Sequence, residues 1–148
     1  CEMAAFYRKQ GKSILQRLNE LYEEFGVHYH TQQNFVCEGE SGMEQMAETM
    51  DRLRNMPPKE IGGYAVTAIE DYEKSVLSNL QSGSRTDISL PKSNVIAYQL
   101  ANGARIVIRP SGTEPKIKAY YTTTGRSKEE AVALEAALKD DFTRVIGL

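Results

Sequence analysis

The sequence has no long apolar run and no strong excess of one charge. None of its stretches approaches the roughly 20 apolar residues needed to cross a bilayer, and no signal peptide is apparent. The 18 basic and 20 acidic side chains give a formal net charge of −2, whereas nucleic-acid-binding domains usually carry a basic patch or stripe. We therefore expect a cytoplasmic protein that binds neither membranes nor nucleic acid.

Residues that form disulfides or bind metals are also scarce. Cys1 and Cys37 are the only cysteines and lie far apart, which favours free thiols over a disulfide framework. The only histidines, His28 and His30, alternate on a stretch with strand character and would share one face. They could in principle bind a metal, but no acidic or cysteine partner is nearby in the sequence. We therefore interpret them as strand-surface residues and expect no metal site.

Two common nucleotide-binding motifs are missing, namely Gly-x-x-x-x-Gly-Lys-Ser/Thr and Gly-x-Gly-x-x-Gly. What is present is the decapeptide RPSGTEPKIK at 109–118. It gathers a guanidinium, two ammonium groups, two hydroxyls and a glycine around one turn, which are groups suited to holding a phosphate. The decapeptide therefore indicates a phosphate-binding loop, although its composition also fits an ordinary solvated turn between two strands.

Three of the four expected helices begin with the same capping pattern. A serine followed three residues later by Glu or Gln can form a capping box, and this pattern occurs at Ser13, Ser41 and Ser127. Apolar residues at helical spacing follow each serine, so helices are expected over 2–10, 13–25, 41–56 and 127–145. We expect the methionines of the third helix, Met43, Met46 and Met50, to lie in the core.

Strand patterns occupy much of the remaining chain. They predict strands over 27–38, 64–70, 94–100, 105–109 and 117–123, with Asn102-Gly103 as a hairpin turn. The polar segment 74–92 has no clear period and is expected to be a long loop. The sequence thus predicts an α+β fold, with a mostly antiparallel sheet of four to five strands and two helices on one face.

The run from Leu90 to Tyr121, which contains the decapeptide, resembles the C-terminal domain of the α-D-phosphohexomutases, the phosphoglucomutase and phosphomannomutase family. The upstream run EGESGMEQMAETMDRLRNMPPKEIGGYAV resembles the start of that domain, and 1–26 resembles the helical tail of the domain before it. The resemblance implies a TATA-binding-protein-like domain over 27–148. Because the chain starts directly at residues that look like the end of a helix, we expect it to be a fragment of a longer enzyme.

The resemblance also implies roles for single residues. It places Arg109, Ser111, Gly112 and Thr113 on the family's phosphate-contacting positions, with Lys118 also near the ligand. The parent enzyme would interconvert hexose 1-phosphate and hexose 6-phosphate through a bisphosphorylated intermediate, using a phosphoserine in its first domain. The expected cofactors of the parent enzyme are Mg²⁺ and hexose 1,6-bisphosphate. The expected partners of this chain are a phosphosugar substrate and the other three domains of the enzyme. The fragment itself is expected to bind no cofactor.

Neither a Thr-Ser-His-Asn-Pro phosphoserine loop nor an Asp-x-Asp metal loop occurs in the chain. No base is evident that would activate Ser111 as a nucleophile, so we expect no catalytic residue here and no mutase activity from the fragment alone. The alternative function is a non-enzymatic ligand-binding or interaction module, in which the helix 13–25 and the basic loop recruit a partner. The Gly-Glu-Ser-Gly run at 39–42 is similar to a sugar-recognising loop of the family, but we interpret it as a helix start because Ser41 can cap.

Overall fold

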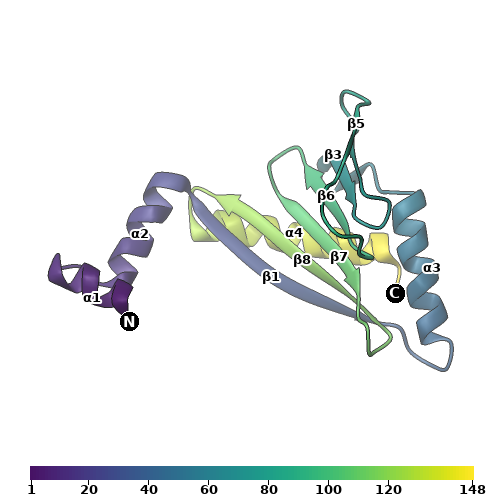
Figure 1. Ribbon diagram of the computed structural model, residues 1–148, viewed down its shortest axis with the longest axis horizontal. Coiled ribbons are helices and arrows are strands. Elements are labelled where there is room, and N and C mark those ends of the chain that lie inside the picture. The colour runs from purple at the N-terminus through teal and green to yellow at the C-terminus, as the bar shows by residue number, and fades with distance from the viewer.

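The computed structural model describes residues 1–148 as one antiparallel sheet with four helices (Figure 1). The helices are α1 (Glu2–Lys9), α2 (Ile14–Phe25), α3 (Gly42–Asn55) and α4 (Lys128–Ile146). The strands are β1 (Val27–Val36), β2 (Glu60–Ile61), β3 (Tyr64–Asp71), β4 (Val76–Asn79), β5 (Arg85–Asp87), β6 (Ile96–Leu100), β7 (Arg105–Pro110) and β8 (Lys116–Gly125). The α+β prediction is confirmed, but the sheet has 8 strands rather than four to five.

The strand order is β1-β8-β7-β6-β3-β4-β5, with β2 paired to β3 beside this path. All these pairings are antiparallel. The Asn102-Gly103 hairpin is confirmed between β6 and β7, and Gly103 has the positive φ of +82° that such a turn favours. None of the helices is long and apolar enough to cross a bilayer.

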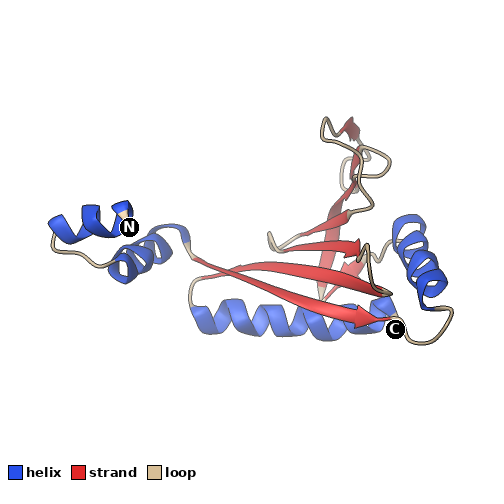
Figure 2. Cartoon of the chain, turned by 60° about the horizontal axis from the view of Figure 1, so that its bottom comes forward, coloured by secondary structure: helices blue, strands red, loops and turns tan.

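Helices α3 and α4 cover one face of the sheet, and α4 lies along β1 and β8 (Figure 2). Every second residue of the strands points into the core between these layers. Phe142 of α4 meets the rings of Phe35 and Tyr121 edge to face, with centroids 6.0 and 6.2 Å away. The core also includes strand and helix side chains that are fully or almost fully buried, among them Met50, Leu53, Ile106, Ile108, Ile117 and Leu138.

The opposite side of the sheet, which we call the open face, has no helix over it. Because Ile106 and Ile108 point into the core, the alternating residues Arg105, Val107 and Arg109 of β7 lie on the open face. The registers of β8 and β1 extend this face with Lys118, Tyr120 and Thr122, and with His28, His30, Gln32 and Asn34. The decapeptide thus begins and ends on a surface that the helices leave uncovered.

The capping predictions are only partly right. At Ser13 the full box forms, because the Gln16 N–H donates to the serine hydroxyl at 3.1 Å and the Ser13 N–H donates to Oε1 of Gln16 at 2.7 Å. Ser127 caps the Glu130 N–H as predicted, but the Glu130 carboxylate accepts from the Arg126 N–H instead of completing the box. Ser41 makes no side-chain cap, which corrects the prediction for α3.

The physical reason at Ser41 is its backbone conformation. An N-cap residue that bonds through its side chain is usually extended, whereas Ser41 has φ −87° and ψ 8°. Tight packing occurs instead at Gly42, where an added Cβ would lie 2.4 Å from the main-chain oxygen of Cys37. The core prediction also fails for Met43, which is 53% exposed while Met46 and Met50 are buried.

The segment 74–92 is not a plain loop, because it contains the β4–β5 hairpin. All residues of β5 are exposed, so an apolar alternation could not reveal the strand. At the other end of the chain, α1 and α2 project away from the sheet and contain no buried residue (Figure 1). Their apolar side chains, including Phe6, Leu15 and Phe25, are 58%, 65% and 61% exposed.

Candidate anion-binding site

The decapeptide forms the turn between β7 and β8. Arg109 pairs with Lys118 and Pro110 with Ile117 at the ends of the two strands. The turn is closed by the Ser111 N–H, which donates to the main-chain oxygen of Lys116 at 2.8 Å. This hairpin brings the predicted residues Arg109, Ser111, Gly112, Thr113 and Lys118 together at one end of the sheet.

The turn rests against the start of α3. The Cys37 N–H donates to the main-chain oxygen of Pro115 at 2.8 Å, and an added Cβ on Gly42 would lie 3.0 Å from Cβ of Pro115. The chain segment 39–42, interpreted above as a helix start, therefore supports one side of the decapeptide. These contacts fix the base of the turn and leave its tip exposed.

The tip offers both backbone and hydroxyl donors. Ser111 is 9% exposed, whereas Gly112 and Thr113 are exposed. A Cβ added to Gly112 would meet no atom within 4 Å, so neither packing nor a positive φ requires glycine at this position. The open space above Gly112 leaves room for an anion to approach the backbone closely.

Four cations lie on this part of the sheet, but two of them are already engaged. Arg105 forms an ion pair with Glu70, with Nη2 and Oε2 2.6 Å apart, and Lys116 forms one with Glu114. Arg109 and Lys118 form no ion pair with any carboxylate. Because these two are cross-strand neighbours, the site presents two adjacent cations that form no ion pair with a carboxylate.

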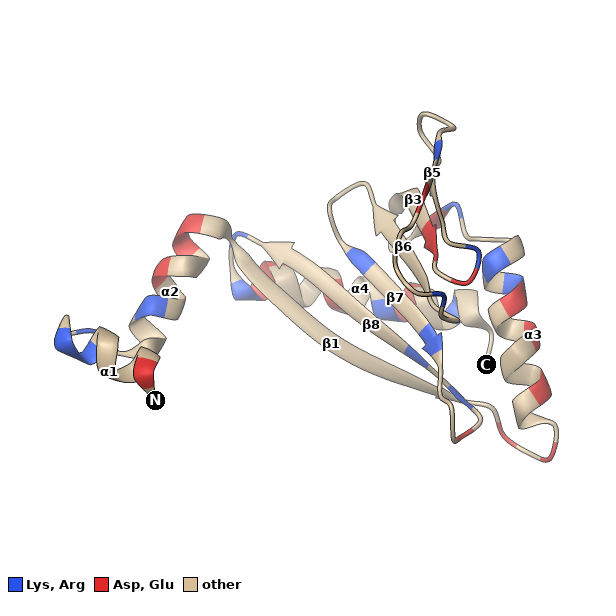
Figure 3. Cartoon of the chain, viewed as in Figure 1, with Lys and Arg blue, Asp and Glu red and all other residues tan.

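The strands that carry these cations have no acidic side chain. Strands β1, β7 and β8 contain no Asp or Glu, although the chain has 20 acidic residues (Figure 3). The nearest carboxylate in the turn is Glu114, and the hydrogen bond from Lys116 lowers its pKa, as do the charges of Lys116 and Lys118. The local field therefore favours a bound anion over a bound cation.

One residue at this site was missed from the sequence. The Arg109 guanidinium lies over the ring of Tyr120, with Cζ 6.0 Å from the ring centroid. Tyr120 follows Lys118 by two residues and shares the open face with it. An arginine and a tyrosine on neighbouring strands could be paired only once the strand register was known.

The histidines lie where their alternation predicted. His28 and His30 are both exposed on the open face of β1, and their Nδ1 atoms lie 3.3 and 3.0 Å from the hydroxyls of Thr124 and Thr122.

Both cysteines are free thiols. Cys37 is buried, and its burial raises the pKa of the thiol.

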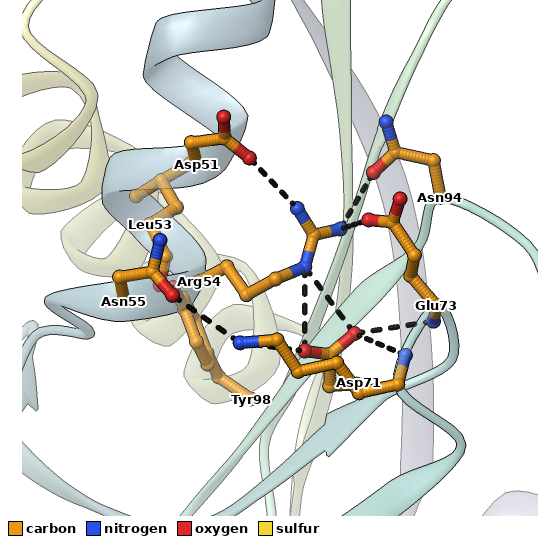
Figure 4. A network of polar contacts seen from close by, with 9 residues as sticks. Asp51, Leu53, Arg54, Asn55, Asp71, Glu73, Asn94 and Tyr98 are labelled. Atoms are coloured by element: carbon orange, nitrogen blue, oxygen red, sulfur yellow. Dashed lines mark hydrogen bonds and ion pairs between the residues drawn. The ribbon is translucent and has the colours of Figure 1, made fainter.

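A second polar cluster, centred on Arg54, lies away from the decapeptide (Figure 4). The Arg54 side chain is 5% exposed and forms ion pairs with Asp71 at 3.3 Å and Glu73 at 2.6 Å. Its Nη2 also donates to Asn94 at 2.7 Å. These bonds connect the end of α3 to the β3–β4 turn and to the segment before β6, beside a cavity of about 290 Å³. Since carboxylates already surround Arg54, the cluster has a structural role.

Comparisons with known proteins agree with the resemblance noted in the sequence. The family model described as phosphoglucomutase/phosphomannomutase, C-terminal domain, matches residues 54–139. A phosphoglucomutase of Staphylococcus aureus (strain USA300) is 41% identical over 112 residues, which are 76% of this chain and 20% of the relative. A phosphoglucomutase of Staphylococcus haemolyticus is 38% identical over 115 residues, or 78% of this chain and 21% of the relative.

A solved structure shares the fold. The open form of the exocytosis-sensitive phosphoprotein pp63/parafusin, a phosphoglucomutase from Paramecium, superposes with a TM-score of 0.56 and 16% identity over 98% of this chain and 25% of its own. At that identity the likeness speaks for the fold alone. The chain spans about one fifth of the length of the curated relatives it matches.

Proposed function

The chain belongs to the phosphoglucomutase/phosphomannomutase family, as a C-terminal domain, and from this premise we propose that its decapeptide holds the non-reacting phosphate of a hexose phosphate. The observation that carries the proposal is the pair Arg109 and Lys118, two neighbouring cations without a carboxylate partner. A phosphate dianion between them would satisfy both charges at once. Such a ligand also suits strands that carry no acidic residue.

Each residue of the turn has a distinct part in this proposal. The Arg109 guanidinium donates two parallel hydrogen bonds to phosphate oxygens, and Lys118 adds a point charge. The backbone N–H groups around Gly112 approach the anion closely, while Ser111 and Thr113 donate from their hydroxyls. This arrangement recognises a phosphate without reading the sugar ring.

In the full-length enzyme, we propose, this grip serves the interconversion of hexose 1-phosphate and hexose 6-phosphate. Clamping the distant phosphate fixes the position of the reacting end, which lowers the entropic cost of the transfer step. A bisphosphorylated sugar that turns around could place either of its phosphates in the same turn. The chemistry itself belongs to the other domains, because no base stands ready to activate Ser111.

We assign the expected cofactors to the parent enzyme, which we place in the cytoplasm. Mg²⁺ would be held by another domain of that enzyme, as the resemblance to the family implies. Hexose 1,6-bisphosphate would meet this domain only through the decapeptide. Residues 1–26 would form the tail of the preceding domain, and 27–148 the phosphate-binding domain.

A different function is favoured by one observation, the apolar side chains of α1 and α2. Met3, Phe6, Leu15 and Phe25 are all more than half exposed, which suits an interaction module. The same surface suits packing against a preceding domain. Self-association of the chain without any response to phosphate would favour the interaction module.

The deciding experiment is an NMR titration of the amide resonances with inorganic phosphate and with glucose 6-phosphate. We expect shifts confined to the turn 109–118 and a dissociation constant at least tenfold weaker in Arg109→Ala, since charge-assisted hydrogen bonds contribute about 1.5–3 kcal/mol. Arg126→Ala is the matched control, because Arg126 is exposed just before α4. Equal losses in both variants, or no localised shifts, would overturn the proposal.

A second measurement concerns activity. The purified chain should not interconvert glucose 1-phosphate and glucose 6-phosphate, because binding and orientation alone do not supply a nucleophile. Turnover above the uncatalysed rate would show that the fragment contains a catalytic group that the proposal lacks.

A further inference from the structure

Arg109 is held by an aromatic ring rather than by a carboxylate. Its Cζ lies 6.0 Å from the centroid of the Tyr120 ring, within the range of a cation–π contact. In the β7–β8 register Arg109 faces Lys118, so Tyr120 is its diagonal neighbour. Diagonal neighbours in an antiparallel pair lie about 7–8 Å apart, which long and aromatic side chains can span.

The kind of partner matters for a residue that must bind an anion. An arginine paired with a carboxylate, as Arg105 is with Glu70, has its charge neutralised and its donors occupied. The face of an aromatic ring attracts a guanidinium through its quadrupole and leaves the N–H donors at the edge of the group free. Arg109 is therefore oriented while its charge stays available.

Orientation is needed here because the two cations repel each other. Arg109 and Lys118 are directly opposed on neighbouring strands, an arrangement that is unfavourable for like charges. Without a bound anion, repulsion would drive the two flexible side chains apart into solvent. The Tyr120 ring gives Arg109 a favourable position above β8, on the same face as Lys118.

The ring itself is held by its own neighbours. Tyr120 is partly buried and stands between Val107 of β7 and Gln32 of β1 in one cross-strand row. These neighbours restrict the ring, so that its face can act as a fixed support. The contact with Arg109 uses the ring and not the phenol hydroxyl.

We propose that Tyr120 is a positioning residue of the phosphate site, holding Arg109 over the open face so that Arg109 and Lys118 converge on one anion. This inference rests on the proposed function of the decapeptide. The anion would then lie on the side of the turn that faces the open face of the sheet.

The test compares Tyr120→Leu, Tyr120→Phe and the control Tyr64→Leu in titrations of the whole chain with inorganic phosphate. Tyr64 is 38% exposed at the start of β3, so its replacement removes a similar ring far from the turn in the sheet order. We expect Tyr120→Leu to weaken phosphate binding about fivefold, as the loss of about 1 kcal/mol would. Tyr120→Phe should bind like the original chain, since it keeps the ring.

A second measurement tests the contact between Arg109 and Tyr120 in the absence of any ligand. The Arg109 side-chain protons should show ring-current shifts that vanish in Tyr120→Leu and persist in Tyr120→Phe. If all three variants bind phosphate like the original chain, or if Tyr120→Phe loses as much as Tyr120→Leu, the positioning role is wrong. If the original chain itself does not bind phosphate, the proposed function fails, and persistent ring-current shifts would then show the contact to be structural only.

Discussion

Glu114 and Lys116 form an ion pair within the candidate phosphate turn. The hydrogen bond from Lys116 lowers the pKa of the Glu114 carboxyl, and the nearby charge of Lys118 acts in the same direction. The carboxylate is therefore ionised at neutral pH. It removes one cation from the set available to an anion and adds a repulsive charge beside the tip of the turn.

Glu114→Gln should consequently strengthen phosphate binding. Removing the carboxylate frees Lys116 and abolishes the repulsion, and for exposed charges we expect a gain of about threefold in affinity at low salt. The gain should shrink as the salt concentration rises, because exposed charges are screened. Glu23→Gln on α2 is the matched control, and weaker binding in Glu114→Gln would mean that the carboxylate supports the turn more than it repels the ligand.

Several elements of the fold could be predicted from the sequence because they depend on local sequence patterns. The helix that follows Ser127 and the Asn102-Gly103 turn depend on near neighbours only, and both are present. The absence of a side-chain cap at Ser41 and the exposure of Met43 could not be foreseen, since both depend on how α3 starts against Cys37 and Pro115. The β4–β5 hairpin was missed because its backbone pairs while its side chains remain polar and exposed.

The candidate site also has features that the sequence could predict and features that it could not. The composition of the decapeptide indicated a phosphate-binding turn, the family resemblance named five residues in it, and the hairpin brings these five to one place. The sequence could not show that Arg105 is engaged by Glu70, a residue from a strand 35 positions earlier. Nor could it separate Lys116, which Glu114 engages within the turn, from the free Lys118, because the conformation of the turn decides this. The contact of Tyr120 with Arg109 depends on the strand register.

Two neighbouring glycines allow a test of local packing. Gly62 and Gly63 both have positive φ, +60° and +82°, but an added Cβ would lie 2.8 Å from Cδ2 of Leu138 at Gly62 and would meet nothing within 4 Å at Gly63. Gly63→Ala should cost about 1 kcal/mol, for the backbone conformation alone. Gly62→Ala should cost about 2–3 kcal/mol, since the clash with buried Leu138 adds to the strain.

Urea unfolding of both variants measures this difference directly. The main-chain N–H of Gly62 also donates to Oδ2 of Asp141 at 2.7 Å, so a backbone shift that relieves the clash would weaken a bond to α4. Equal losses in the two variants would mean that Leu138 moves aside without cost.

Glu70 should make the free energy of unfolding depend on pH in the acid range. Burial acts to raise its pKa, but hydrogen bonds from Tyr72 and Gln99 and the charge of Arg105 outweigh it, and the pKa lies below the usual 4.5. A carboxyl whose pKa is lowered by folding stabilises the folded state above its unfolded pKa, and this contribution is lost as the pH falls through the folded pKa. The stability from Glu70 should therefore be complete at neutral pH, begin to fall near the unfolded pKa of about 4.3, and be lost once the pH is below the lowered pKa of the folded state.

Glu70→Gln provides the measurement. At pH 7 the variant should be less stable than the original chain, because Arg105 loses its ionised partner, and the difference should narrow as the pH falls through the acid range. Chemical denaturation at several pH values follows this change. Glu48→Gln, an exposed position on α3, is the control, and a gap that stays constant from pH 7 to pH 3 would contradict the linkage.

A chain beginning at Val27 should fold as the complete chain does. Helices α1 and α2 contain no buried residue, while the pairing of β1 with β8 starts at Val27 and Gly125, so removing 1–26 takes away no core contact. We expect the Tm to change by less than about 4 °C, the shift that about 1 kcal/mol produces in a domain of this size, and phosphate titration to give the same shifts. A chain beginning at Cys37 is the contrasting variant, because it also loses β1 and the core residue Phe35, and it should not fold stably. A large fall in Tm for the Val27 chain would mean that the domain boundary after residue 26 is wrong. It would also show that α1 and α2 pack back onto the sheet.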